Sequence, residues 1–354
     1  MIKNFSNYNI LDKELKNLVS FAKKNKLKSG FCIGNTSKKE NLNFFLTPFR
    51  QNEKCIVTGV IVYSENIAKK IVQILNKYKI DYIFVDSEKK IPNPKKINEV
   101  SNLERVVKEN SNIKVLTYKG NDITVEAVNS LLNILFSKFV NGLGGKKIAL
   151  IGLGNIGTKL AIKLVEQGAY LYVSRRNKTY QNLICKTINL IKPKYNESIA
   201  QGLKNKNFAE LDIIIAAANE KRIITKQIIS KLKNKSIIID VGKDNLDKGV
   251  ISESNKKEID IYRLDISSAF ISTISSLIYS DEILKNSFGR KKINNNYFVS
   301  GGMIGHHNDI VVDNINNIKK IIGLADGKGD FVRKLHYKQK KLILKLRKDY
   351  DKIF

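Results

Sequence analysis

Short apolar runs rich in β-branched residues recur along this chain, and stretches with the apolar spacing of amphipathic helices separate them. Strands are predicted at Cys55–Tyr63, Asp81–Val85, Ile113–Tyr118, Lys147–Ile151, Tyr170–Arg176, Leu211–Ala218, Ser236–Gly242 and Ile259–Leu264. Helices are predicted at Leu11–Asn25, Glu65–Lys79, Asn102–Asn110, Ile123–Val140, Thr225–Leu232 and Ser267–Tyr279. Strands that alternate with helices predict an α/β protein with a parallel, doubly wound sheet.

The same pattern divides the chain into four parts. Residues 1–122 are expected to form an N-terminal α/β substrate domain, and residues 123–142 a linking helix. Residues 143–285 are expected to form a Rossmann dinucleotide-binding domain, and residues 286–354 a C-terminal segment. The last part closes with a basic helix from Gly329, which we expect to return to the first domain. A chain of 354 residues is long enough for two domains that each bury a core.

Three glycines between an apolar strand and a helix form the most specific motif, Gly152-x-Gly154-x-x-Gly157. In this strand–turn–helix context the first glycine allows a tight turn, the second lets the backbone approach a pyrophosphate, and the third allows close helix packing. The helix begins near Asn155 and Ile156, whose free N–H groups would face the phosphates. The alternative is a glycine turn in a fold that binds no dinucleotide.

The end of the next strand indicates which dinucleotide would bind. An NAD site usually has an acidic residue about 20 residues after the glycines, where it binds the ribose 2′-hydroxyl. This chain instead has Ser174, Arg175 and Arg176. A hydroxyl and two guanidinium groups suit a 2′-phosphate, so we predict NADP, with NAD the less favoured cofactor. The alternative is that two arginines fell here by chance in a basic protein.

Composition excludes several classes of protein. The longest apolar runs, such as Ile213–Ala218, are too short to span a bilayer, and the N-terminus has no apolar signal region. Cys32, Cys55 and Cys185 are widely spaced and only three histidines occur, which disfavours a metal site. We therefore expect a cytoplasmic protein without membrane contact or bound metal.

The formal net charge of +30 could suggest a nucleic-acid-binding protein. However, the basic residues are spread along the chain and are not interleaved with aromatic residues as in a stacking platform. Abundant Lys, Asn and Ile are typical of an AT-rich genome. Nucleic-acid binding is therefore the third alternative. We expect a small-molecule partner, an attraction for anionic substrates, and the possibility of a homodimer.

The layout resembles NADP-dependent two-domain dehydrogenases of the shikimate dehydrogenase and methylenetetrahydrofolate dehydrogenase type. The likeness is strongest in the glycine motif and in Leu211–Gly242, whose second strand ends in Asp-Val-Gly. The resemblance implies that the cofactor lies beside two short segments that follow these strands, namely Ala217, Ala218 and Asn219, and Val241 and Gly242. The substrate motifs of these enzymes are not matched, since Tyr63 is followed by Ile67 where a catalytic lysine would stand.

Hydride transfer needs one acid/base group near the substrate. Lys119 and Asp122 follow a strand and precede the linking helix, so we predict Lys119 as proton donor and Asp122 as its partner. His306, in a glycine-rich segment, is predicted to approach the same crevice. The alternatives are that Lys119 and Asp122 belong to a polar turn and that His306 belongs to a flexible hairpin. Asp265 is a further candidate, and its alternative is a helix cap. The leading function is a soluble NADP-dependent oxidoreductase, and the other is a regulatory dinucleotide-binding protein without a reaction.

Overall fold

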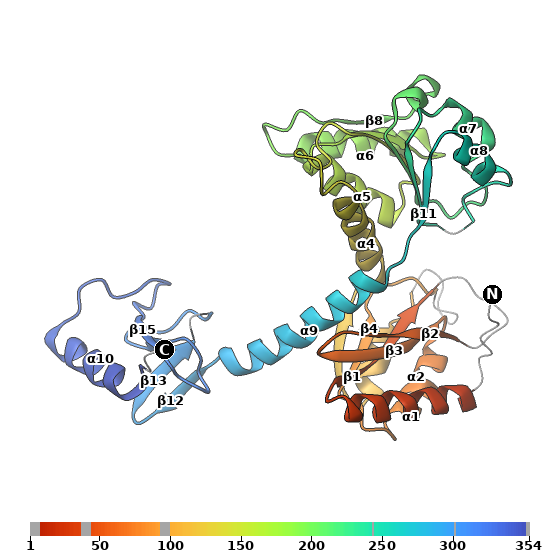
Figure 1. The fold of residues 1–354 in the computed structure, drawn as a ribbon. Coiled ribbons are helices and arrows are strands. Elements are labelled where there is room, and N and C mark those ends of the chain that lie inside the picture. The colour runs from red at the N-terminus through yellow and green to blue at the C-terminus, as the bar shows by residue number, and fades with distance from the viewer. Residues whose placement is uncertain (1–7, 37–43, 93–99, 243, 301, 352–354) are drawn as a thin grey trace. The chain divides into compact units, whose positions relative to one another are not determined.

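The computed structural model describes residues 8–36, 44–92, 100–242, 244–300 and 302–351 (Figure 1). The chain forms two compact units, Met1–Ile274 and Ser275–Phe354, which are described separately below. The boundary falls inside a helix, whereas the Rossmann domain was predicted to end at residue 285. None of the helices in the described ranges is long and apolar enough to cross a membrane.

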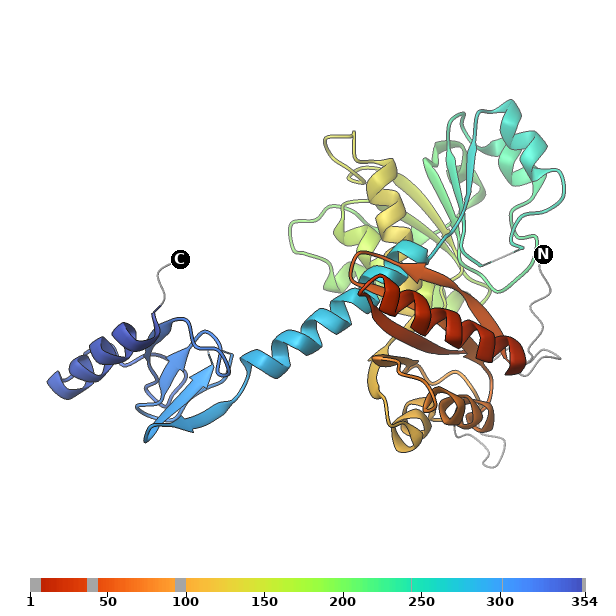
Figure 2. The ribbon, with the colours of Figure 1, turned by 60° about the horizontal axis from the view of Figure 1, so that its bottom comes forward.

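The first unit begins with a five-stranded mixed sheet of order β2-β3-β1-β4-β5. Its strands are β1 (Lys28–Asn35), β2 (Phe45–Gln51), β3 (Cys55–Val62), β4 (Tyr82–Asp86) and β5 (Lys114–Tyr118). Only β2 runs antiparallel to its neighbour. The helices α1 (Tyr8–Lys24), α2 (Glu65–Leu75) and α3 (Leu103–Asn110) share one apolar core with this sheet (Figure 2).

Two of these strands, β1 and β2, were not predicted from the sequence. The central strand β1 contains Gly30, and a glycine in a strand interior weakens the sequence signal for a strand. A Cβ at Gly30 would lie 2.6 Å from the ring of Phe84, so only glycine fits between the neighbouring strands. The strand β2 contains Pro48, and it lies at the edge of the sheet, where proline is tolerated.

The second sheet of this unit has six parallel strands in the order β11-β10-β9-β6-β7-β8. They are β6 (Lys147–Ile151), β7 (Tyr170–Ser174), β8 (Ala200–Gly202), β9 (Ile213–Ala216), β10 (Ile237–Asp240) and β11 (Asp260–Arg263). The chain moves outward from β6 in one direction and then returns to build β9–β11 on the other side. This is the strand order of a Rossmann fold and confirms the predicted fold class.

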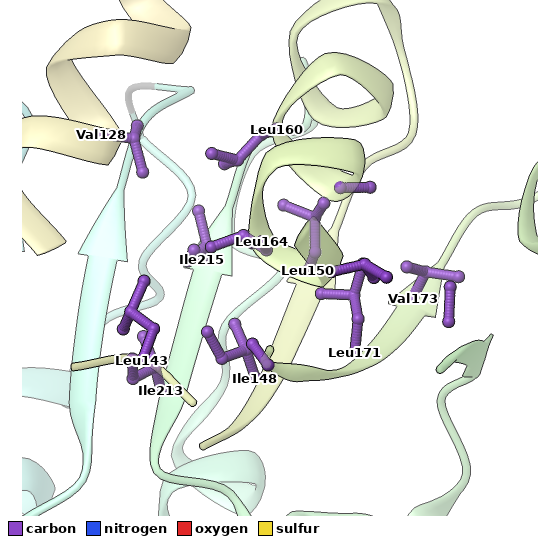
Figure 3. Packing of buried hydrophobic residues seen from close by; sticks show 14 of the residues in the cluster. Val128, Leu143, Ile148, Leu150, Leu160, Leu164, Leu171, Val173, Ile213 and Ile215 are labelled. Atoms are coloured by element: carbon purple, nitrogen blue, oxygen red, sulfur yellow. The ribbon is translucent and has the colours of Figure 1, made fainter. Parts of the chain in front are cut away.

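Helices cover both faces of the six-stranded sheet. One face packs against α4 (Gly120–Leu135), α5 (Asn155–Glu166) and α6 (Lys178–Ile191). Ile148, Leu164 and Ile215 lie in this layer (Figure 3). The other face packs against a short 3₁₀ helix (Asn205–Glu210), α7 (Lys226–Lys231) and α8 (Val250–Lys256). The linking helix α4 begins three residues before the predicted Ile123 and ends at Leu135 rather than Val140.

A long helix, α9 (Ser267–Ser287), crosses from the first unit into the second. The second unit has a four-stranded sheet of β12 (Arg290–Ile293), β13 (Asn296–Ser300), β14 (Ile310–Val312) and β15 (Ile321–Leu324). The last helix, α10 (Tyr337–Tyr350), begins after the predicted Gly329. Its buried residues Ile343 and Leu346 pack against this sheet. The sheet of its own unit therefore buries the apolar side of α10, and a return to the first domain stays a prediction.

We predict that Leu346→Ala destabilises the second unit by about 2–5 kcal/mol, because it removes a buried leucine from a small core. Hydrogen exchange should accelerate at β13–β15 and remain unchanged at β6–β10. Faster exchange in the first unit would instead show that α10 stabilises that unit.

Candidate functional site

The glycine loop after β6 combines two packed glycines with one open position. Gly152 has φ +107°, and a Cβ there would lie 2.7 Å from the backbone of Ala217. A Cβ on Gly157 would lie 1.8 Å from the carbonyl oxygen of Gly152. At Gly154, by contrast, no described atom lies within 4 Å of the added Cβ. The first and third glycines are required by packing, and the second borders free space.

The helix that follows this loop presents an open N-terminus. Gly154 is the N-cap of α5, and no side chain caps the helix. The side-chain oxygen of Asn155 accepts a hydrogen bond from Asn121 at 3.2 Å, and Ile156 packs on the Rossmann core. A helix N-terminus without a side-chain cap offers backbone N–H donors and a partial positive charge to an anion.

The end of β7 brings two arginines to the glycine loop. The backbone N–H of Gly152 donates to the carbonyl of Ser174 at 2.9 Å, so β7 ends beside the loop. The guanidinium of Arg175 donates to the carbonyl of Leu153 at 2.6 Å. Arg176 is largely exposed and pairs with Glu220 at 2.8 Å. The strand itself contributes no carboxylate to this position.

The ends of β9 and β10 close the other side of the loop. The N–H of Ala217 donates to the carbonyl of Ile151 at 2.8 Å. A Cβ at Gly242 would lie 2.2 Å from the carbonyl oxygen of Ala218, so these two segments are in close backbone contact. Val241 packs against the core, and Asn219 is exposed at the rim. The structure therefore brings the predicted cofactor segments together at the carboxyl edge of the sheet.

A cavity of about 720 Å³ adjoins this edge within the first unit. Asp240, Val241 and Arg263 line it from β10 and β11. The N-terminal sheet contributes polar and charged side chains at its own carboxyl ends and at β2, namely Asn35, Arg50, Asp86, Lys90 and Tyr118. The carboxyl ends of parallel strands are the usual place for ligands in α/β folds. The cavity thus has walls from both sheets.

Lys90 lines this cavity and is held by two carboxylates. Its ammonium contacts Asp86 at 2.9 Å and Glu88 at 2.6 Å. Burial lowers the pKa of Lys90, but the hydrogen bonds to Glu88 and Asp86 outweigh burial and hold the pKa above its ordinary value. Gly120 donates its N–H to Asp86, and a Cβ there would lie 2.9 Å from that carboxylate. Lys90 is therefore charged at neutral pH.

This cluster was not predicted from the sequence. Asp86 is the last residue of β4, whereas the predicted strand ended at Val85. A carboxylate at the carboxyl end of a buried strand, followed four residues later by a lysine, was the available signal.

Lys119 and Asp122 do not form the predicted pair in the first unit. Lys119 is exposed, is the N-cap of α4 and does not line the cavity. Asp122 forms an ion pair with Lys159 of α5, so the proposed Lys119–Asp122 pair is not formed. His306 belongs to the second unit, where its backbone N–H donates to Asp309 at 2.8 Å. The approach of His306 to the cavity of the first unit stays a prediction.

Asp265 lines the cavity and also caps α9. Its carboxylate accepts the backbone N–H of Ser267 at 2.8 Å, as the capping alternative required. Hydrogen bonds from the side chain and backbone of Ser267 hold the pKa of Asp265 below its usual value. Among the residues that the structure describes, no group of three or more His, Cys, Asp or Glu could hold a metal ion.

Asp240 is the most deeply buried charged residue of the cavity wall, with 2% of its surface exposed. Neither of its carboxylate oxygens accepts a hydrogen bond within the described ranges. Arg263 approaches to only 3.6 Å. Burial raises the pKa of Asp240, and Arg263 offsets this effect only in part. A buried carboxylate without donors in a cavity is typical of a ligand-binding group.

Comparison with known proteins agrees with this geometry. Residues 147–267 match the family model of the NAD-binding domain of 6-phosphogluconate dehydrogenase. This segment is an NAD(P)-binding Rossmann domain. The match covers the glycine loop, β7, and the carboxyl ends of β9–β11.

The proteins that match this chain over longer stretches have low sequence identity to it. The chain is 26% identical over 147 residues to the bifunctional protein FolD of Thermosipho melanesiensis, covering 41% of this chain and 45% of that protein. It is 25% identical over 202 residues to a glycerol-3-phosphate dehydrogenase [NAD(P)+] of Clostridium botulinum, covering 51% and 59%. The chain thus spans about half the length of the curated relatives it matches. The A chain of dipicolinate synthase from Bacillus subtilis is similar at 15% identity and a TM-score of 0.37, covering 71% of this chain and 78% of that one.

We predict that Gly154→Val folds normally but weakens NADP+ binding by at least about tenfold, because the new side chain fills the space that the pyrophosphate needs. Gly157→Val is the contrast, since its side chain would collide with the Gly152 carbonyl and lower the melting temperature. Calorimetric titration and thermal melts measure the two effects. If Gly154→Val binds NADP+ as the parent does, the motif is only a structural turn.

Proposed function

We propose that this protein is an NADP-dependent oxidoreductase that transfers a hydride between the nicotinamide ring and a small anionic molecule bound in the cavity. The observation that carries this proposal is the open cavity of about 720 Å³ that adjoins the dinucleotide site at Asp240 and Val241. A regulatory protein that only bound the dinucleotide would have no need for such a space, and side chains could fill it. The catalytic alternative is therefore favoured.

The arginines after β7 support NADP as the cofactor. Arg175 donates to the glycine loop and its guanidinium lies 5.1 Å from the ring centroid of Tyr180. It is thus held where the adenosine ribose of a dinucleotide would lie. Arg176 is free to exchange its pairing with Glu220 for a phosphate. No acidic side chain of β7 competes with the 2′-phosphate.

The cavity charges support an anionic substrate. Arg50 donates to the hydroxyl of Ser267 at 3.1 Å, and its guanidinium lies 5.0 Å from the ring centroid of Phe270. Arg263 lies across the cavity wall and is largely exposed. Two arginines in one cavity favour a carboxylate or phosphate. The distant relative named for glycerol-3-phosphate is consistent with such a substrate.

Lys90 is the best-placed group to assist the reaction. In the reductive direction the hydride of the reduced nicotinamide adds to the carbonyl or imine carbon, and the charged Lys90 donates a proton to the oxygen or nitrogen and regains one from solvent. In the oxidative direction the carbon–hydrogen bond breaks, its hydride moves to the nicotinamide, and the proton of the hydroxyl or ammonium passes to solvent through Lys90 after Lys90 has released its own proton. Asp86 and Glu88 position its ammonium. Lys90 thus takes the role that we predicted for Lys119. Nucleic-acid binding and a homodimer stay predictions.

We predict that Arg175→Ala weakens NADP+ binding by about 10- to 100-fold and leaves NAD+ binding nearly unchanged, since one charge-assisted hydrogen bond contributes about 1.5–3 kcal/mol. The parent should bind NADP+ more tightly than NAD+. Calorimetric titration with both dinucleotides measures this preference. Equal affinities in the parent would exclude NADP as the specific cofactor.

Substrate-dependent changes in NADPH absorbance, screened over small carboxylates and phosphates, test the reaction itself. On any substrate so found, Lys90→Met should lower kcat by about 10²–10⁴-fold, the usual contribution of a general acid. Lys119→Met is the matched control and should retain the parent rate, because Lys119 does not line the cavity. The reverse result would restore the sequence-based assignment. Binding of NADP+ with no turnover of any compound would favour the regulatory alternative.

A further inference from the structure

Two side chains that line the cavity have acceptor oxygens without donors. They are the two carboxylate oxygens of Asp240 and the side-chain oxygen of Asn35, all buried and unpaired among the described residues. Buried acceptors in a folded protein are nearly always satisfied by protein, water or ligand. The three oxygens therefore indicate a ligand group that is rich in hydrogen-bond donors.

The orientation of Asn35 is set by its own hydrogen bonds. Its amide nitrogen donates to the carbonyl of Glu88 at 2.8 Å and to that of Asp86 at 3.3 Å. Both partners are acceptors, so the nitrogen must face them and the oxygen must face away. Asn35 is 9% exposed and belongs to the cavity wall. Its free oxygen is thus an acceptor of defined direction.

The cavity also holds a cation, Arg50, whose charge acts on Asp265 only at a distance beyond an ion pair. No carboxylate of the described residues lies within ion-pair distance of the Arg50 guanidinium, which instead contacts Ser267 and the Phe270 ring. Asp240 carries the opposite charge at the other wall. Asp240 has Arg263 at 3.6 Å but no hydrogen bond, so a ligand with a cationic donor group and an anionic group would complete both walls.

We infer that the cavity holds a small zwitterion of the amino-acid class, whose ammonium group donates to Asp240 and Asn35 and whose carboxylate binds Arg50. This inference rests on the proposed function and replaces its anionic molecule by one whose carboxylate is accompanied by an ammonium group. An ammonium has three donors, which matches the three unpaired oxygens, whereas a hydroxyl has one. It also supplies the positive charge that a buried carboxylate requires.

A second source of donors is the carboxamide of the nicotinamide ring, since Asp240 lies at the dinucleotide edge of the cavity. The two sources predict different effects of Asp240→Asn. If Asp240 binds the ammonium, NADP+ affinity is unchanged in the variant. If Asp240 binds the carboxamide, NADP+ affinity falls while that of adenosine 2′,5′-bisphosphate, which lacks the nicotinamide, does not.

The test uses the full chain saturated with NADP+ and four probes of equal carbon skeleton at millimolar concentration. Norvaline carries ammonium and carboxylate, 2-hydroxyvalerate carries hydroxyl and carboxylate, valerate carries the carboxylate alone, and pentylamine the amine alone. Thermal shift and calorimetry should rank norvaline first. Asp240→Asn should reduce norvaline affinity about tenfold or more, to the level of valerate. Arg50→Gln should weaken all three carboxylates and spare pentylamine.

The melting temperature of Asp240→Asn as a function of pH shows whether the variant is folded. The raised pKa of Asp240 means that its contribution to stability is full below the ordinary carboxyl pKa and is lost as the pH rises through the raised value. Arg263 and Asp244 are the charged groups that act on it. The unliganded variant should therefore melt above the parent at neutral pH, by a margin that shrinks towards pH 4. Asp260→Asn, an exposed residue of β11, is the matched control and should change neither property.

The outcomes separate the two proposals. Preferential stabilisation by norvaline that disappears in Asp240→Asn supports the amino-acid class. Equal or weaker stabilisation by norvaline than by valerate or 2-hydroxyvalerate overturns it, as does a selective loss of NADP+ affinity in Asp240→Asn. If the parent binds NADP+ normally, such a result leaves the oxidoreductase proposal intact. Failure to bind NADP+ at all overturns the proposed function instead.

Discussion

Close backbone packing at the carboxyl edge of β6, β9 and β10 is the constraint on which the site depends. Gly152, Gly157 and Gly242 each approach a neighbouring backbone so closely that an added Cβ would lie within 2.7 Å of a carbonyl oxygen. These contacts fix the start of α5 and the end of β10 at the same edge. The space beside Gly154 and the position of Asp240 follow from that arrangement, because both are attached to the segments that the glycines join.

Charge is distributed unevenly between the two parts of the site. At the dinucleotide end the helix N-terminus, Arg175 and Arg176 are all positive, which suits phosphates. In the cavity, Asp86 neutralises Lys90, whereas Asp240 reaches Arg263 only at 3.6 Å and Arg50 makes no close ion pair within the described ranges. A ligand with charges of both signs would satisfy those two groups. The high net charge of the chain is thus less informative than the few buried charges that remain unpaired.

The dinucleotide site could be predicted from the sequence because it is local. Gly152–Gly157 and the following strand lie within one βαβ unit, so spacing along the chain fixes their geometry. The cavity could not be predicted in this way. Asn35 and Arg50 belong to strands whose glycine and proline content concealed them, and they meet Asp240 only through tertiary packing. Lys119 was favoured because it follows a strand, but the helix begins there and its side chain is exposed.

The central claim is that one dinucleotide site and one adjoining cavity act together in the first unit. Hydrogen exchange of the full chain with and without millimolar NADP+ tests this claim most directly. We expect slower exchange at Gly152–Gly157 and at the ends of β9 and β10, with further protection at β1 and β4 because the nicotinamide would enter the cavity. Unchanged exchange at the glycine loop, or protection that stops short of β10, would contradict the account.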